Sequence, residues 1–569
     1  MIVINYFVLF FVIFFYTFSL IGAGILLNNY LSKDQKYHVG LLGLYGFIVI
    51  FLISVLLHFF LPLKLEITFP ILLFFLFIFI KNYKKIEDIN ILLLLMPLAL
   101  LASSTIKFHD DFYWYHLPTI NYVQNFKIIF GISNINHYIY GHALYDIMSM
   151  FKFPYIENKI IKNIPIIFLM FSFIYLKNLF NKDDSLKLLI IFLASIILLR
   201  YTRSKEFGAD IVSQLLIILV FVNCYLHLKT SQNKYFKNIL IFFLFGIFNK
   251  QYVIFSIPFV LLSFLNAIKN FDIKNYKKII IFLSLLVTLS LGKNVIQTGC
   301  FFYPIKYSCP NFNFISWSAG SEFHTISEQK LQADAKGYKA YLRNIEEKKI
   351  VKQLNHEEYL DANKIKYLYF ITKDNDFKKF LTLLLILFIT FLFSSNLRFN
   401  KKNDFNKKLF FSSLISFLIL VYYSPQTRYG GNAFALIFIF SLLNYFFDFK
   451  INLKKFFFIL SLYLFFFIGK NINRIKNEYH YLGIYKKNYP IIDLKIIPYS
   501  TTNKNNVKIN ISSNKLFCYN IKMLCTTSNT FDSIKKIKNI SNYYIIIPDK
   551  QKNILSYKKD ILYINKNWK

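Results

Sequence analysis

The chain has 569 residues, of which 56% are hydrophobic, 20% aromatic and 17% charged, with a mean hydropathy of +0.43. Apolar runs of about 17–25 residues, long enough to cross about 30 Å of hydrocarbon, recur along most of it and exclude an ordinary soluble protein. The formal net charge of +37 does not indicate nucleic-acid binding, because many lysines cluster between the apolar runs, as the positive-inside rule describes. The composition indicates an all-α polytopic membrane protein, with membrane lipid as the only partner that charge implies.

The apolar runs predict about 12–14 membrane-spanning helices of roughly 20 residues each. The first run lacks a basic lead-in and a small-residue cleavage site, so we expect a retained span rather than a signal peptide. The expected spans are 3–27, 39–61, 67–80, 89–105, 160–177, 186–200, 209–227, 236–248, 251–268, 279–297, 378–396, 408–424, 432–448 and 454–470.

Alternate connections between these spans are rich in lysine, which places them in the cytoplasm. This pattern predicts a multi-pass protein of a bacterial inner membrane, with the other connections and the tail in the periplasm. We divide the chain into six parts: N-terminal spans 1–104, an outward loop 105–160, a helical bundle 161–297, a large outward loop 298–377, C-terminal spans 378–470 and a small outward domain 471–569.

The outward loop begins with the segment His109-Asp110-Asp111-Phe-Tyr-Trp-Tyr-His116, just past the fourth span. Ionisable groups at the edge of the hydrocarbon are costly, so they favour a functional interpretation. Asp110 or Asp111 could act as a general base that takes a proton from an acceptor hydroxyl. Two alternatives stay open: solvated aspartates that cap a helix, and a divalent-metal site that uses the histidines and aspartates, with His137 or His142 as further ligands.

After this motif, Pro118 suits a first helical turn and Gly131 a helix end. Apolar residues at helical spacing over 118–129, with polar residues opposite, predict a helix lying in the membrane interface. Such a helix would hold the aspartates, with His109 and His116 beside them, where a lipid-linked head group meets water.

Other polar residues fall on the same expected side, where basic groups could hold a phosphate leaving group. For each of them, an ordinary snorkelling residue is the alternative. The candidates for substrate binding are Arg203, Asp210, Lys250 and Arg428.

Four of the five cysteines form close pairs on the expected outward side, Cys300 with Cys309 and Cys518 with Cys525. An oxidising compartment would allow two disulfides, although spacing alone does not separate these from neighbouring free thiols. The tail has strand-like runs at 507–511 and 543–547, which predict a small α/β or mainly β domain.

Three short motifs resemble bacterial proteins of the GT-C glycosyltransferase superfamily, a resemblance that spans roughly residues 85–530. They are Asp111-x-x-x-Tyr-His-Leu-Pro118, Lys293-Asn-x-x-x-x-Gly-x-x-x-Tyr-Pro304 and Arg428-Tyr-Gly430. The closest likeness is to a subgroup with a cysteine-containing tail. The resemblance implies a GT-C-like fold that uses a polyprenyl-phosphate-linked sugar on the outward face, with Asp110 or Asp111 as the base and Asp210 as a second acidic position. The chain differs from better-known members in having about three spans before the acidic loop and an Asp-Asp pair in place of Asp-Glu.

The leading hypothesis is therefore an inverting glycosyltransferase of the cell envelope that moves a sugar from polyprenyl phosphate to a glycan, lipid or protein. A transporter or flippase of a lipid-linked saccharide is the first alternative, although it would favour charges near the midplane and internal repeats. A polysaccharide polymerase or ligase and a structural scaffold are the others.

Overall fold

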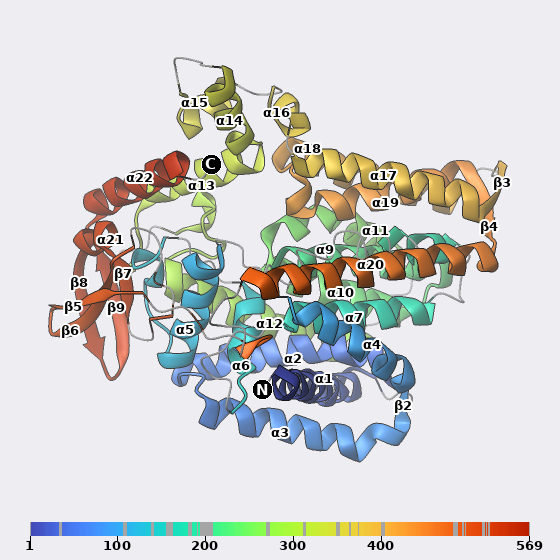
Figure 1. Ribbon diagram of the computed structural model, residues 1–569, viewed down its shortest axis with the longest axis horizontal. Coiled ribbons are helices and arrows are strands. Elements are labelled where there is room, and N and C mark those ends of the chain that lie inside the picture. The colour runs from blue at the N-terminus through green and yellow to red at the C-terminus, as the bar shows by residue number, and fades with distance from the viewer. Residues whose placement is uncertain are drawn as a thin grey trace.

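The computed structural model describes residues 2–32, 37–105, 111–137, 142–154, 163–179, 185–190, 192–193, 209–268, 273–310, 315–348, 353–362, 366–373, 375–399, 404–481, 488–491, 494, 497–514, 518, 520–521 and 524–567. The described residues are mostly helical and form four small sheets. Most long helices run across the view from the C-terminal sheets at left toward the β3–β4 hairpin at right (Figure 1). We call these two ends of the bundle the sheet end and the hairpin end.

The N-terminal part contains α1 (Ile2–Leu31), β1 (Tyr37–His38), α2 (Val39–Phe60), α3 (Leu65–Asn82), β2 (Ile86–Glu87) and α4 (Ile89–Ser103). The part that follows contains α5 (Leu117–Asn125), α6 (Ala143–Met150), α7 (Ile164–Leu179), α9 (Ala209–Thr230), α10 (Asn233–Asn249), α11 (Ile257–Ile268) and α12 (Ile273–Thr298).

The large loop contains the short helices α13 (Ser321–Ala335), α14 (Tyr338–Lys348), α15 (His356–Ala362) and α16 (Tyr367–Lys373). The later long helices and their hairpin are α17 (Asn375–Ser394), β3 (Ser395–Phe399), α18 (Asp404–Tyr423), α19 (Asn432–Phe446), β4 (Phe447–Ile451) and α20 (Leu453–Tyr481). The C-terminal domain contains β5 (Tyr499–Lys504), β6 (Val507–Ser512), β7 (Cys525–Thr527), α21 (Ser528–Ser533), β8 (Ile534–Ile540), β9 (Tyr543–Pro548) and α22 (Lys550–Asn567).

Nine helices in the described ranges are long and apolar enough to cross a membrane, and α4 and α7 are shorter apolar helices. Each predicted span lies on a helix of the structure, except that 186–200 falls largely outside the described residues. Large apolar side chains stay exposed on the outside of the bundle, as on Phe77 (63%), Leu94 (74%) and Phe465 (73%). A face that meets lipid rather than water explains that exposure.

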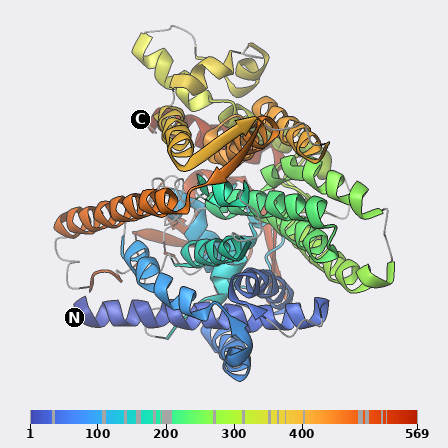
Figure 2. The same ribbon diagram turned by 90° about the vertical axis from the view of Figure 1, so that its right-hand side faces the viewer.

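The first helices pack through small residues. In Figure 1 α1 is seen end-on and in Figure 2 along its length, so it crosses α2 and α3. A Cβ atom on Gly24 would lie 1.8 Å from the Leu42 carbonyl oxygen, and one on Gly46 would lie 1.9 Å from that of Leu20. Glycine at both positions therefore lets the two backbones touch.

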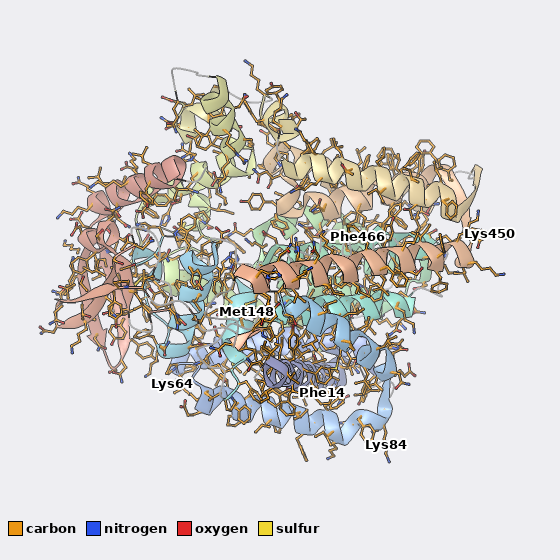
Figure 3. The ribbon with its side chains drawn as sticks, in the orientation of Figure 1. Phe14, Lys64, Lys84, Met148, Lys450 and Phe466 are labelled. Carbon is orange, nitrogen blue, oxygen red and sulfur yellow. A yellow bond between two sulfur atoms is a disulfide. The ribbon has the colours of Figure 1, made fainter. Side chains whose placement is uncertain are left out.

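The connections alternate between the two ends as the lysine pattern predicts. At the hairpin end, Tyr37 of β1 pairs with Ile86 of β2, and β3 pairs with β4 in an antiparallel register. The Lys177 ammonium, in the last turn of α7, lies 3.2 Å from the Asp88 carboxylate, which joins the α7 end to the connection that contains β2. Figure 3 shows Lys84 and Lys450 at this end and Lys64, at the start of α3, at the other.

The interfacial helix predicted over 118–129 differs from the observed helix, α5. It covers only Leu117–Asn125 and ends six residues before Gly131, which has a φ of +70°. Its residues from Leu117 to Val123 are all buried, because α6 packs against it and the C-terminal domain covers it. The Tyr122 hydroxyl donates to the Cys525 carbonyl oxygen at 2.6 Å. The helix therefore lies inside the molecule rather than on a membrane surface.

The tail forms the small α/β domain that its strand-like runs predict. β5 and β6 pair antiparallel, β7 joins β6 in parallel, and β8 and β9 form a separate antiparallel pair. Phe130, in the loop after α5, bridges to Ile545 of β9, so the domain is joined to the outward loop. The preceding helix α20 runs to Tyr481, eleven residues past the predicted boundary at 470.

Candidate functional site

A cavity of about 470 Å³ lies at the sheet end of the bundle. Its walls come from connections far apart in sequence that the span pattern puts on one side: Asp111 after α4, Lys250 after α10, Thr298 at the end of α12 and Tyr423 at the end of α18. Residues of the large loop and Ile564 of α22 complete the lining. The connections that were predicted to lie on one side thus converge on this cavity.

Asp111 brings a buried carboxylate to this cavity, with only 6% of the residue exposed. It precedes a π-helical turn, Phe112–His116, a widened form of helix that is frequent at functional sites. The Tyr115 hydroxyl donates to Asp111 Oδ2 at 3.3 Å, and Tyr115 also lines the cavity. Pro118 then begins α5, because its missing N–H costs nothing in a first helical turn.

Lys250 reaches the cavity from a short turn that Asn249 holds in place. The Asn249 amide donates to the Ala209 carbonyl oxygen at 3.0 Å and to Ser213 Oγ at 2.7 Å, and its Oδ1 accepts from the Leu144 backbone N–H. The Lys250 ammonium then lies 3.4 Å from Asp210 Oδ1. Two predicted residues, Lys250 and Asp210, are therefore an ion pair at the edge of the cavity.

His142 is a neutral ring on the cavity wall. Burial, followed by the charges of Lys250 and His116, holds the pKa of His142 well below its usual range. Its Nδ1 lies 2.8 Å from the Asn249 carbonyl oxygen, which can only accept, so Nδ1 carries the proton and Nε2 is the basic nitrogen. His116 lies behind this wall, with its ring 5.0 Å from that of Tyr145, and is not among the lining residues.

The helices α13 and α14 add charged groups that sequence reasoning missed. The Lys330 ammonium lies 2.7 Å from Asp334 Oδ2, and both residues line the cavity together with Lys339 and Glu328. Burial acts to raise the pKa of Asp334, but Lys330, Lys339 and His356 outweigh it and hold the pKa below its usual range. Only the four-residue spacing of Lys330 and Asp334 signals this pair, and that spacing is common on any solvated helix.

One side of the cavity is apolar and reaches the outside of the bundle. The rings of Phe248 and Phe302 stack at 6.3 Å, and those of Phe255 and Tyr423 stack at 6.0 Å. Ile254, beside them, lines the cavity and is 46% exposed. The cavity therefore borders an apolar surface at the level where the long helices end.

Both predicted cysteine pairs are disulfides, Cys300–Cys309 and Cys518–Cys525, while Cys224 is free and buried. The first closes a loop whose Tyr303, Pro304 and Ile305 line the cavity. Among the described residues, the one group with metal-ligand proximity is Cys300, Cys309 and His324. Its two sulfurs are bonded to each other, so they do not offer thiolates to a metal.

A buried ion pair lies next to the cavity. The Lys293 ammonium of α12 contacts Asp146 Oδ2 of α6, with side-chain exposures of 5% and 1%. His58 of α2 is also buried, and Asn294, which follows Lys293, lines the cavity. The sequence marks Lys293 by its place in a short motif at the end of a span, but no local pattern in the eight-residue helix α6 indicates that Asp146 is buried.

The structure describes only some of the remaining predicted residues. His109, Asp110 and Arg203 lie outside the described residues. Arg428 lies in the turn Thr427–Gly431, and the next residue, Tyr429, lines the cavity. Of the predicted site, Asp111 and Lys250 therefore reach the cavity directly, Asp210 pairs with Lys250, and His116 is buried close by.

The fold and cavity define a mostly helical protein with many helices of membrane-spanning length and a cavity at their ends whose lining includes several charged residues. The chain belongs to the family described as "Domain of unknown function (DUF8201)", whose profile matches residues 5–435. That range includes almost the whole cavity but not Ile564 of α22. No curated protein matches the chain, and no solved structure does.

Proposed function

We propose that the protein is an inverting membrane glycosyltransferase that moves a sugar from a polyprenyl-phosphate donor to an acceptor of the cell envelope. The observation that carries the proposal is the meeting of Asp111, His142 and Lys250 in a cavity that is polar at its end and apolar at its side. A lipid-linked sugar has the same division, because its tail is apolar and its reacting groups are polar.

The chemistry follows from the charges. A carboxylate, Asp111 or its neighbour Asp110, takes the proton of an acceptor hydroxyl as the oxygen forms a bond to the anomeric carbon. The bond from that carbon to the phosphate oxygen breaks, and the phosphate leaves with the electron pair. Lys250, with Arg203 and Arg428 as further candidates, neutralises the departing charge. Because attack and departure are on opposite faces, the configuration inverts.

The donor enters from the lipid. Ile254 is exposed beside the stacked rings of Phe255 and Tyr423, so a polyprenyl chain on the outside of the bundle can place its phosphate inside without crossing water. The two disulfides at the sheet end support a periplasmic position of this end, since disulfides persist in oxidising compartments. Lysine-rich connections at the hairpin end support a cytoplasmic position of the other.

The buried pair Lys293–Asp146 gives little support to a transporter. Lys293 precedes the end of α12 by five residues, about 7–8 Å along the helix, so it lies near the end of its span rather than at the midplane. His58 is likewise close to the end of α2 at Phe60. Transporters place such charges near the midplane on broken helices.

The test uses a strain that lacks the gene, complemented with variants and analysed by mass spectrometry of envelope glycolipids and glycans. We expect Asp110→Asn with Asp111→Asn to reproduce the profile of the deletion, with one sugar missing and its acceptor accumulated. The control is Asp361→Asn, an exposed carboxylate of α15, which should restore the wild-type profile. Full restoration by the double variant, at equal protein level in the membrane, would contradict the proposal. A change in polymer length alone would indicate a polymerase or ligase.

A further inference from the structure

The C-terminal domain carries an unusual excess of positive charge for its position. Residues 498–569 contain 13 lysines and three acidic residues. If the sheet end is periplasmic, this charge lies on the side that the positive-inside rule does not favour. A membrane-topology signal therefore does not account for these lysines.

The excess charge is on the surface. Lys535, Lys536 and Lys538 of β8 are exposed because the buried side chains of that strand are Ile534 and Ile537. On α22, Lys550, Lys552, Lys558 and Lys559 are exposed, while Asn553, Tyr557 and Asp560 face inward. We give the name lysine face to Lys535, Lys536, Lys538, Lys552, Lys558 and Lys559; their two elements, β8 and α22, both contact the short helix α21.

Acidic groups do not balance the lysine face within the described part of the domain. Asp560 is 4% exposed, and Asp549 accepts a hydrogen bond from the Lys552 backbone N–H at 3.2 Å, where it caps the first turn of α22. Asp532 is the one exposed carboxylate. None of the six lysines has an ion pair with a described residue. A solvated protein surface that binds no partner commonly carries both positive and negative charges. The lysine face carries mainly positive charge, which favours an anionic ligand.

The α22 part of the lysine face lies on the helix that contributes to the cavity wall. The inner side of α22 contributes Ile564 to the cavity lining, and its Tyr557 ring packs 4.9 Å from that of Phe323 at the start of α13. The helix thus has lysines outside and a cavity wall inside. A long ligand that binds along α22 would have one end at the site where Asp111 lies.

An anionic glycan fits this surface better than a lipid bilayer does. Figure 1 shows α22 extending beyond the ends of the long helices, in roughly their direction rather than across it. A helix that binds a bilayer lies flat in the interface. The strand β8 is also part of the lysine face, and it stands in the sheets farthest from the bundle (Figure 1).

We propose that the lysine face binds an acidic glycan, one bearing carboxylate or phosphate groups, and presents it as the acceptor. The role of this glycan as acceptor rests on the proposed function, whereas its binding to the lysine face does not. It names the chemistry that the sequence left open: the recipient of the sugar is a polyanion.

The experiment measures binding of fluorescent polygalacturonate to the full-length protein in nanodiscs of zwitterionic lipid, with uncharged dextran as the comparison. The test variant changes all six lysines to Gln. The matched control changes Lys81, Lys84 and Lys85, which are exposed at the hairpin end, to Gln. We expect the test variant to bind polygalacturonate about tenfold more weakly or worse, and raising the salt from about 0.05 to 0.5 M to weaken wild-type binding strongly.

Three results would overturn the inference. The first is equal binding of dextran and polygalacturonate, and the second is an equal loss of polygalacturonate binding in the control variant. The third is a test variant that loses binding to vesicles of anionic lipid but not to polygalacturonate. Thermal unfolding and an intact Cys518–Cys525 bond check that the six-lysine variant is folded. The Asp110→Asn, Asp111→Asn variant should bind polygalacturonate normally while it fails in transfer. Failure of binding with normal transfer would thus reject this inference and leave the proposed function standing.

Discussion

The two ends of the helical bundle differ in how deeply their charged side chains are buried. At the hairpin end the ion pairs are partly exposed, as in Lys177–Asp88 with 46% and 22% side-chain exposure and Lys408–Asp404 with 59% and 73%. At the sheet end the Lys293–Asp146 pair is almost fully buried, and Asp111 is buried on the cavity wall. Desolvating a charge is costly, so the buried charges among the described residues of the sheet end favour a functional use there.

The largest expected effect is on the stability of the sheet end. Replacing Lys293 by Ala leaves the Asp146 carboxylate buried without its ammonium partner, which costs about 3–5 kcal/mol in buried pairs. Replacing Lys177 by Ala at the hairpin end removes a largely solvated pair, worth about 0–1 kcal/mol. Thermal unfolding of both purified variants measures the difference.

A double variant sharpens this comparison. Lys293→Met with Asp146→Leu removes both charges together, so most of the lost thermal stability should return. If the single Lys293 variant were as stable as the Lys177 variant, the buried pair would not differ from a surface one, and the contrast between the ends would fail.

The second effect concerns the cavity wall. The Cys300–Cys309 disulfide closes a loop with a sequence separation of nine residues, and loop-closure entropy for about ten residues corresponds to about 2–3 kcal/mol. Serine at both positions should lower the unfolding temperature, whereas Cys224→Ser, at a buried free thiol, should change it less.

Thiol labelling reports on the same bonds. Denatured protein that has not been reduced should take one alkylating group, at Cys224, and reduced protein should take five. Five labels without reduction, in protein isolated from its native membrane, would contradict the disulfides and remove their support for the proposal of a periplasmic sheet end.

The smallest effect is a pH dependence in the C-terminal domain. Burial raises the pKa of Asp560 to about 7, although a hydrogen bond from Asn529 acts to lower it. The folded domain therefore holds this proton more tightly than the unfolded chain does, so the contribution is present at low pH and is lost as pH rises from about 4 through 7. Asp560→Asn should flatten that decline in unfolding temperature. An unchanged slope would mean that another group causes it.

The sequence predicted the helices better than the site. Apolar length and lysine spacing depend on local composition, so helices such as α2, α9 and α12 follow from the sequence with small boundary errors. The short helix α5 was expected at a membrane surface, because an amphipathic pattern does not say what covers it. The C-terminal domain covers it, and the hydrogen bond from Tyr122 of α5 to Cys525 spans 403 residues of sequence.

The site was predictable where a residue is unusual for its own neighbourhood. Asp111 and Lys250 stand out beside apolar runs, and both reach the cavity. Lys330 and Asp334 sit in a polar loop and look ordinary there, and only the fold of α13 over the cavity gives them a place in it. The convergence of the connections is a property of topology, which the order of spans constrains but does not determine.

The most direct test of the account is whether a lipid-linked sugar enters the cavity from its apolar side. A photoreactive polyprenyl-phosphate sugar is added to membranes that contain either the Ile254→Cys or the Leu94→Cys variant, and crosslinking at the introduced cysteine is measured. Leu94 of α4 is the control because it is also apolar and is more exposed than Ile254. The account predicts a crosslink at Ile254 that excess unlabelled polyprenyl phosphate removes, and none at Leu94. Equal crosslinking at both positions, or crosslinking at Leu94 alone, would contradict it.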